Sequence, residues 1–272
     1  MFGSRILLLA THPDDELAGC CAVIGRARAQ GAEVSVAFLT TGIPARSRLW
    51  PWERSGHPER VERRRREARR VCAELDIDIA LFSDIAARHL KNEIRATREL
   101  VARLCVDRRA DMIWVAGYEG GHPDHDIANF IASTFRHDLP VWEFSEYNYC
   151  GGRVRCNEFC AATGKEIDLK LSAEEGGLKK ALLAMYASER DNLSYLRTER
   201  EVFRPLAAYD YSRPPHRERF SIAAMRGRRS IRGLTRFGRS KCRAQSRSFK
   251  PGANSWGCGL RARPTWRERE AR

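Results

Sequence analysis

Short runs of apolar residues alternate with longer amphipathic stretches along most of the chain. The apolar runs predict five strands, at residues 5–10, 33–40, 79–83, 112–116 and 140–147. The amphipathic stretches predict four helices, at residues 17–30, 58–75, 93–108 and 127–135. Strands that alternate with helices build a largely parallel sheet covered on both faces, so the pattern predicts an α/β, Rossmann-like fold.

The pattern changes after the fifth predicted strand. Residues 151–171 suggest a hairpin that turns at residues 163–165 (TGK). Ser172 and Glu175 form a capping-box pattern, which predicts a helix that runs from there to about residue 196.

Two acidic motifs that carry histidines each follow a predicted strand. The first, THPDDE, occupies residues 11–16, and the second, GGHPDHD, occupies residues 120–126. In an open parallel sheet, the loops at the carboxyl ends of strands converge on the crevice where ligands bind. We therefore expect the two motifs to contribute to one metal site.

The residue types in the motifs narrow the choice of ion. Imidazole and carboxylate ligands without thiolate suit Zn²⁺ or another divalent first-row ion such as Fe²⁺. His12, Asp15 and His125 would supply the three protein ligands that a catalytic zinc usually has. Asp14 lies beside them, where it could take a proton from an attacking water, and His122 could face a developing oxyanion.

A structural role is the alternative for each motif taken alone. His-Pro and Asp-Asp pairs are common in turns, and the acidic residues Asp14, Asp15 and Glu16 would favour the start of a helix in any case. The presence of two such motifs at matching strand ends favours the metal site. Glu16 is the exception, and we interpret it as a structural residue.

The two motifs resemble those of a known family, the LmbE-like, PIG-L-type zinc deacetylases. That family has an AHPDDE-type motif early and an HPDH-type motif later, and here Thr11 takes the usual alanine position. The resemblance continues through residues 185–189 (MYASE) and 209–216 (YDYSRPPH), so that it covers most of residues 1–216. It implies that the metal is bound by His12, Asp15 and His125, with Asp14 as general base, His122 as electrostatic stabiliser, and Asp124 as a residue that orients a histidine.

The resemblance also implies a reaction. It is the hydrolysis of a linear amide that removes an N-acetyl group from an N-acetylglucosamine-containing small molecule or glycoconjugate. An amidase that acts on a thiol-sugar conjugate or on an acylated natural product is the alternative. The chain has no GxGxxG after its first strand, no P-loop and no GxSxG, so the sequence gives no support to nicotinamide, Walker-type or serine-hydrolase chemistry.

A long loop follows the second predicted strand at residues 41–57. Trp50 and Trp52 in this loop could stack on a sugar face, or they could anchor the loop to the body of the protein. The next helix contains an arginine run, residues 63–66, with glutamates interspersed, which predicts a solvated face rather than a nucleic-acid site.

The net charge of +14 comes entirely from residues 217–272, which hold 17 Lys and Arg against 3 Asp and Glu. The preceding deacetylase-like domain, residues 1–216, is neutral, so the pI of 9.8 says nothing about its substrate. The basic segment has no sustained period and predicts a disordered tail or an altered end of the chain. A protein that binds nucleic acid through this tail is the alternative from a different functional class.

The cysteines and the N-terminus predict a cytoplasmic protein. The cysteine total of 9 is odd, and the spacing of Cys150, Cys156 and Cys160 matches no strong zinc pattern, so we expect free thiols. The first apolar run is too short for a signal peptide, and no run approaches the length of a membrane span.

Overall fold

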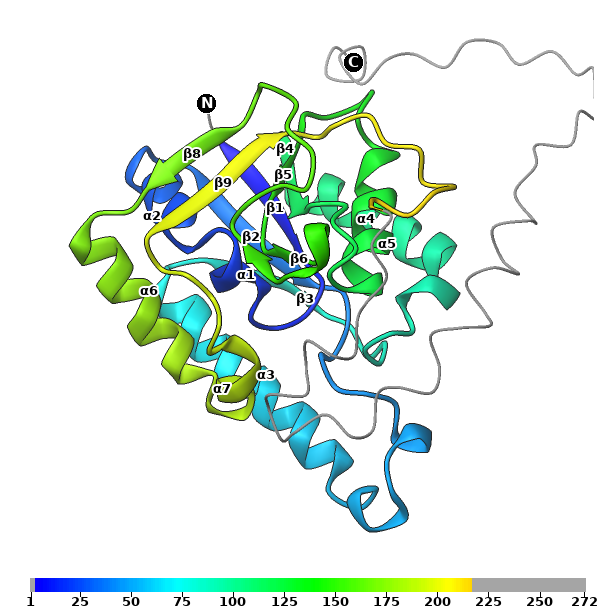
Figure 1. Ribbon diagram of the computed structural model, residues 1–272. Helices are drawn as coiled ribbons and strands as arrows, with labels where there is room; N and C mark the ends of the chain where they lie inside the picture. Colours follow the sequence, from blue (N-terminus) through cyan, green and yellow to red (C-terminus); the bar gives the residue numbers. More distant parts are fainter. Residues whose placement is uncertain (1–2, 217–272) are drawn as a thin grey trace, which may run out of the picture. The chain divides into compact units, whose positions relative to one another are not determined.

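The apolar runs of the chain form the strands of a seven-stranded sheet (Figure 1). The computed structural model describes residues 3–216, so the predictions for the basic tail lie outside the described residues. The strands of the sheet are β1 (Arg5–Ala10), β2 (Glu33–Phe38), β3 (Asp78–Phe82), β4 (Met112–Ala116), β5 (Val141–Phe144), β8 (Ile167–Lys170) and β9 (Arg200–Pro205). A separate pair of short strands consists of β6 (Tyr147–Asn148) and β7 (Arg155–Cys156).

Helices cover both faces of the sheet, which confirms the predicted fold class. They are α1 (Asp15–Ala18), α2 (Cys21–Ala29), α3 (His57–Glu74), α4 (Ile94–Asp107), α5 (Pro123–Ser133), α6 (Ala173–Met185) and α7 (Arg190–Leu193). Alternate residues of β1 point to opposite faces: Leu8 packs in one core with α2, α3 and α6, and Leu9 packs in the other with α4 and α5. Figure 1 shows these two helical layers on either side of the strands.

The strand order creates a crevice at the centre of the sheet. The order is β3-β2-β1-β4-β5-β9-β8, and the first five strands are parallel. From β1 the chain moves outward to β3 and then returns to β4 on the other side of β1. Ligands bind at such a change of direction, outside the carboxyl ends of the strands. The loops that follow β1 and β4 are the two histidine motifs.

Several predicted boundaries differ from the structure. The helix predicted at residues 17–30 is broken between Ala18 and Cys21 into α1 and α2. Gly19 lies at the break, where a side chain would lie 2.2 Å from the ring of Phe144, so the close packing requires glycine. The capping box of Ser172 and Glu175 is confirmed, but α6 ends at Met185 rather than near residue 196.

The hairpin predicted within residues 151–171 is wrong. The turn at residues 163–165 leads into β8, which pairs with β9, and the short hairpin is formed instead by β6 and β7. Strand β9 was not predicted, because three of the six residues in its sequence, REVFRP, are charged. Two of them, Glu201 and Arg204, are buried through ion pairs.

The prediction of free thiols is also wrong for one pair of cysteines. Cys150 and Cys160 form a disulfide, and their Cα atoms are 5.7 Å apart, a separation that suits this bond. Cys156 is free and half-buried, and the remaining described cysteines are buried and free. Among residues 3–216, no helix is long and apolar enough to cross a bilayer.

A fully buried ion pair connects α1, α2, α6 and β9. Lys179 of α6 donates from Nζ to Glu201 of β9 over 2.8 Å and to the carbonyl oxygen of Ala18 over 3.0 Å. Glu201 also accepts the backbone N–H groups of Ala22 and Val23 at the start of α2. Both charged side chains are 0% exposed. The pair therefore fixes the helices that follow the first motif.

We expect Lys179→Met to lower the free energy of unfolding by about 3–5 kcal/mol, because it leaves Glu201 buried without its cation. Chemical denaturation of the full chain measures the loss. Arg95→Met is the control, since the Arg95–Glu99 pair is exposed and such pairs contribute about 0–1 kcal/mol. Equal losses for the two variants would contradict the role assigned to Lys179.

Candidate metal centre

The three predicted metal ligands lie together at the carboxyl ends of β1 and β4. Nδ1 of His12 is 3.2 Å from Nε2 of His125 and 3.7 Å from Oδ1 of Asp15, and Nε2 of His125 is 3.5 Å from Oδ2 of Asp15. Ligand atoms that surround a zinc ion as a tetrahedron, with bonds of about 2.1 Å, are about 3.4 Å apart. The measured distances are close to this value, although they involve both oxygens of Asp15. Among the described residues, donor atoms that could share an ion also group His12 with His122 and His125, and Asp15 with His125 and Glu146.

The charges around these ligands also fit a divalent cation. Four carboxylates are buried at this point, and they belong to Asp14, Asp15, Asp124 and Glu146. Burial lowers the pKa of His12, but the charges of Asp15 and Asp124 outweigh it and raise that pKa to about 10. The pocket thus attracts positive charge, which a metal ion would supply in exchange for protons.

Asp14 has an unusual backbone conformation, with φ of 134°. Such conformations cost about 1–3 kcal/mol and persist where surrounding contacts enforce them. The N–H of Asp14 donates to Glu16, and its carboxylate accepts a 2.7 Å hydrogen bond from Arg64. Burial raises the pKa of Asp14 to about 6, although the charge of Arg64 opposes the shift. The strained residue is thus a carboxylate that titrates close to neutral pH.

Glu16 has the structural role that we predicted for it. One carboxylate oxygen accepts the hydroxyl of Tyr186 on the adjoining helix, and the other accepts the N–H of Asp14. Burial raises the pKa of Glu16 to about 8. Glu16 therefore holds the bend of the first motif in place.

Asp124 contacts the first motif from the start of α5. Its Oδ2 is 3.4 Å from Nε2 of His12, the ring nitrogen that faces away from the other ligands. The same carboxylate accepts the backbone N–H groups of Arg88 and Leu90. The position of Asp124 is therefore fixed by the backbone, as an orienting residue requires.

His122 is the N-cap residue of α5. Its Nδ1 accepts the N–H of Asp124 over 3.2 Å, so a neutral ring carries its proton on Nε2. Burial lowers the pKa of His122 well below its usual value, and the positive charges of His12 and His125 lower it further. The ring lies edge-on to His12 with centroids 4.5 Å apart. His122 is therefore a neutral hydrogen-bond donor beside the ligands.

Sequence reasoning missed Arg64, which we had assigned to the solvated face of a charged helix. Arg64 is only 2% exposed, and it donates to Asp14 and to the carbonyl oxygen of Pro13. It also pairs with Glu189, which follows α6. The prediction is wrong for this residue because α3 turns one arginine of the run toward the first motif.

Glu146 was missed as well. It follows β5, the parallel strand beside β4, and its Oε2 is 3.6 Å from Nδ1 of His125. The strand-end rule that located the two motifs would have found it. Tyr118, four residues before His122, packs against Tyr209 and Tyr211.

The two tryptophans of the 41–57 loop do not anchor it to the body of the protein. Trp50 is 63% exposed and Trp52 is 72% exposed, and their rings stack on each other with centroids 5.1 Å apart. A contact of these rings with a sugar stays a prediction.

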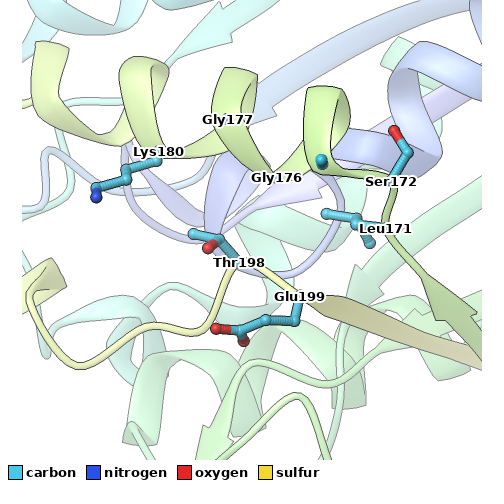
Figure 2. Close-up of a pocket in the computed structure, with 8 residues that line it drawn as sticks. Leu171, Ser172, Gly176, Gly177, Lys180, Thr198 and Glu199 are labelled. Atoms are coloured by element: carbon cyan, nitrogen blue, oxygen red, sulfur yellow. The ribbon is translucent and has the colours of Figure 1, made fainter.

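A shallow groove elsewhere in the described chain contains none of the predicted site residues. It lies between the start of α6 and the segment that leads into β9, and Figure 2 shows the side chains that line it, among them Ser172, Lys180 and Glu199. The predicted site residues therefore lie at the central crevice and not in this groove.

Comparison with known proteins identifies the segment that carries both motifs. Residues 7–135 match the family model described as PIG-L: GlcNAc-PI de-N-acetylase. The match makes this segment of the 272-residue chain similar to PIG-L family domains. All six predicted site residues lie in the matched segment, whereas Glu146 and β9 lie beyond it.

Solved structures share the fold of the chain. Teicoplanin deacetylase Orf2 is 16% identical with a TM-score of 0.59, over 76% of this chain and 99% of that chain. The A40926 pseudoaglycone deacetylase Dbv21 is 19% identical with a TM-score of 0.58 over the same shares. N,N'-diacetylchitobiose deacetylase from Pyrococcus horikoshii is 16% identical with a TM-score of 0.53, over 74% of this chain and 83% of that chain. A search of curated proteins gives no match.

We expect Zn²⁺ to raise the thermal midpoint of unfolding, because the ion would bind only the folded arrangement of the three ligands. At a free concentration about 100 times its Kd, the ion would add about 2.7 kcal/mol of stability. Differential scanning calorimetry measures the shift. The shift should disappear in His125→Ala and persist in His137→Ala, a control at an exposed histidine. An equal shift in both variants would place the bound ion elsewhere.

Proposed function

We propose that the chain is a metal-dependent, and specifically zinc-dependent, hydrolase that removes an N-acetyl group from an amino-sugar-containing substrate. One observation carries the proposal. Asp14, a buried carboxylate with a pKa of about 6, adjoins the predicted ligands His12, Asp15 and His125, whose donor atoms lie 3.2–3.7 Å apart. A site that only held a structural ion would need neither this base nor the neighbouring donor on His122.

A bound ion and the protein side chains would have different roles in the hydrolysis. A divalent ion held by His12, Asp15 and His125 would act as a Lewis acid on the amide carbonyl and lower the pKa of the attacking water. Asp14 accepts a proton from that water as the water oxygen bonds to the carbonyl carbon. The hydrogen bond from Arg64 orients the carboxylate of Asp14 for this transfer.

His122 and Asp14 complete the reaction. The Nε2–H group of His122 donates to the oxygen that becomes negative as the tetrahedral carbon forms. Asp14 then gives its proton to the amide nitrogen, the C–N bond breaks, and the products are acetate and a free amine. Water is the only co-reactant: its oxygen becomes part of the acetate, and its proton reaches the amine through Asp14.

The names of similar proteins support an amino sugar as the substrate class. The matched family is described by a GlcNAc-containing lipid, and one solved neighbour is a diacetylchitobiose deacetylase. Two other neighbours are deacetylases of teicoplanin and of the A40926 pseudoaglycone, which favours an acylated natural product as the second candidate. A panel that contains N-acetylglucosamine, N,N'-diacetylchitobiose and an N-acylated glycopeptide separates the candidates.

We expect Asp14→Asn to reduce turnover by about 100- to 10,000-fold, the usual contribution of a general base, while zinc stays bound. Amine release measured with a fluorogenic reagent, together with metal content, tests this on the best substrate of the panel. The Asn side chain keeps an oxygen that can accept from Arg64, so the fold should tolerate the change. Retained activity would contradict the assignment of Asp14 as the base.

We expect Arg64→Gln to move the acidic limb of the kcat/KM profile to higher pH. The charge of Arg64 lowers the pKa of Asp14, so its removal raises that pKa. Because the base acts only when deprotonated, activity then appears at a higher pH than in the parent chain. Arg65→Gln is the matched control, because Arg65 contacts Ser83 and Asp84 instead. An acidic limb that stays in place would contradict the coupling.

A further inference from the structure

Glu146 is a buried carboxylate for which the proposed reaction has no use. The residue is 1% exposed, and its Oε1 has no hydrogen-bond partner among the described residues. Its Oε2 lies 3.6 Å from Nδ1 of His125. An unpaired carboxylate at such a depth is costly, so the burial needs a partner that stabilises negative charge.

The backbone around Glu146 is held firmly against the second motif. Glu119 accepts the N–H of Glu146 over 3.0 Å and the hydroxyl of Ser145 over 2.7 Å. A side chain at Gly121 would lie 2.2 Å from the carbonyl oxygen of Tyr147, so this chain segment touches the motif directly. The carboxylate of Glu146 is thus aimed at His125 by contacts on both sides.

Among residues 3–216, the charged groups that act most strongly on Glu146 are the carboxylates of Asp14, Asp15, Glu16 and Glu119, which oppose its charge. Arg64 is engaged by Asp14 and Glu189. The ring of His125, 3.6 Å from Oε2, is the basic group that lies beside Glu146.

His12 and His125 are arranged in the same way. Each ring directs one nitrogen toward the other ligands, Nδ1 of His12 and Nε2 of His125. Each ring has a carboxylate beside its other nitrogen, Asp124 beside His12 at 3.4 Å and Glu146 beside His125 at 3.6 Å. Glu146 therefore lies beside the outer ring nitrogen of His125 in the same way that Asp124 lies beside the outer ring nitrogen of His12.

We propose that Glu146 is a positioning residue of the metal centre, which accepts the Nδ1–H of His125 and thereby directs Nε2 to the ion. A carboxylate in this position fixes the tautomer and the orientation of a ligating imidazole and strengthens it as a ligand. The inference rests on the metal site of the proposed function, and it extends that site beyond the two motifs. It does not depend on the identity of the substrate.

Zinc affinity tests the proposal without any substrate. Competition with a chromophoric chelator gives the Kd of the parent chain and of Glu146→Gln, which keeps the shape and removes the charge. We expect the Gln variant to bind zinc about 10- to 100-fold more weakly, with the thermal midpoint of the metal-free protein unchanged. An unchanged Kd would overturn the positioning role while leaving the proposed function intact. A parent chain that binds no zinc would overturn both.

Glu67→Gln is the matched control. Glu67 is also a buried glutamate, but it lies on α3 and its carboxylate accepts the N–H and the hydroxyl of Ser188. We expect its zinc Kd to stay within about twofold of the parent value, since these contacts do not involve a ligating ring. An equal loss in both variants would show a general charge effect and would overturn the proposal.

A second measurement covers the case in which Glu146→Gln does not fold. In the zinc-loaded parent chain, long-range ¹H–¹⁵N spectra identify which nitrogen of His125 carries the proton. The proposal requires a proton on Nδ1 that exchanges slowly with water, because Glu146 accepts it in a buried site. A proton on Nε2, or rapid exchange at Nδ1, would overturn the assignment.

Discussion

The cluster of buried carboxyl groups at the carboxyl ends of β1 and β4 is the constraint on which the site depends. Ionised carboxylates are costly to bury unless they meet a cation or several hydrogen bonds. Asp14 forms an ion pair with Arg64, and Asp124 accepts two backbone N–H groups. Asp15 and Glu146 instead lie beside histidine rings. A divalent ion between the histidines, as proposed above, would offset the cost of burying these carboxyl groups.

The topology explains how residues more than a hundred positions apart meet at one point. The first motif follows β1 and the second follows β4, and these strands are hydrogen-bonded neighbours with parallel register. Both loops therefore leave the sheet in the same direction and from adjacent positions. Sequence reasoning could predict this much, because strand ends and polar motifs are visible in the pattern of apolar runs. It could not supply the strand order itself, which depends on packing between distant elements.

Residues whose partners come from distant elements were beyond that reasoning. Arg64 belongs to a run of arginines that are identical in sequence terms, and only the orientation of α3 turns this one toward Asp14. Strand β9 reads as polar because Glu201 and Arg204 are charged, yet Lys179 and Glu143 neutralise them inside the fold. In both cases the side chain is buried by a partner that the local sequence does not reveal. Local pattern therefore predicts elements better than it predicts buried ion pairs.

The centre is consequently supported by more of the chain than the two motifs. Glu189 on the chain after α6 pairs with Arg64, and Arg64 holds Asp14. On the opposite side, Glu119 fixes the backbone of Glu146, which faces His125. Rigid support of this kind keeps catalytic and ligating groups in place, where a displacement of about 1 Å can cost about 100-fold in rate. Two of these supports, Glu146 and Glu189, lie outside residues 7–135, so the matched segment contains the predicted site residues but not all of the structure that orients them.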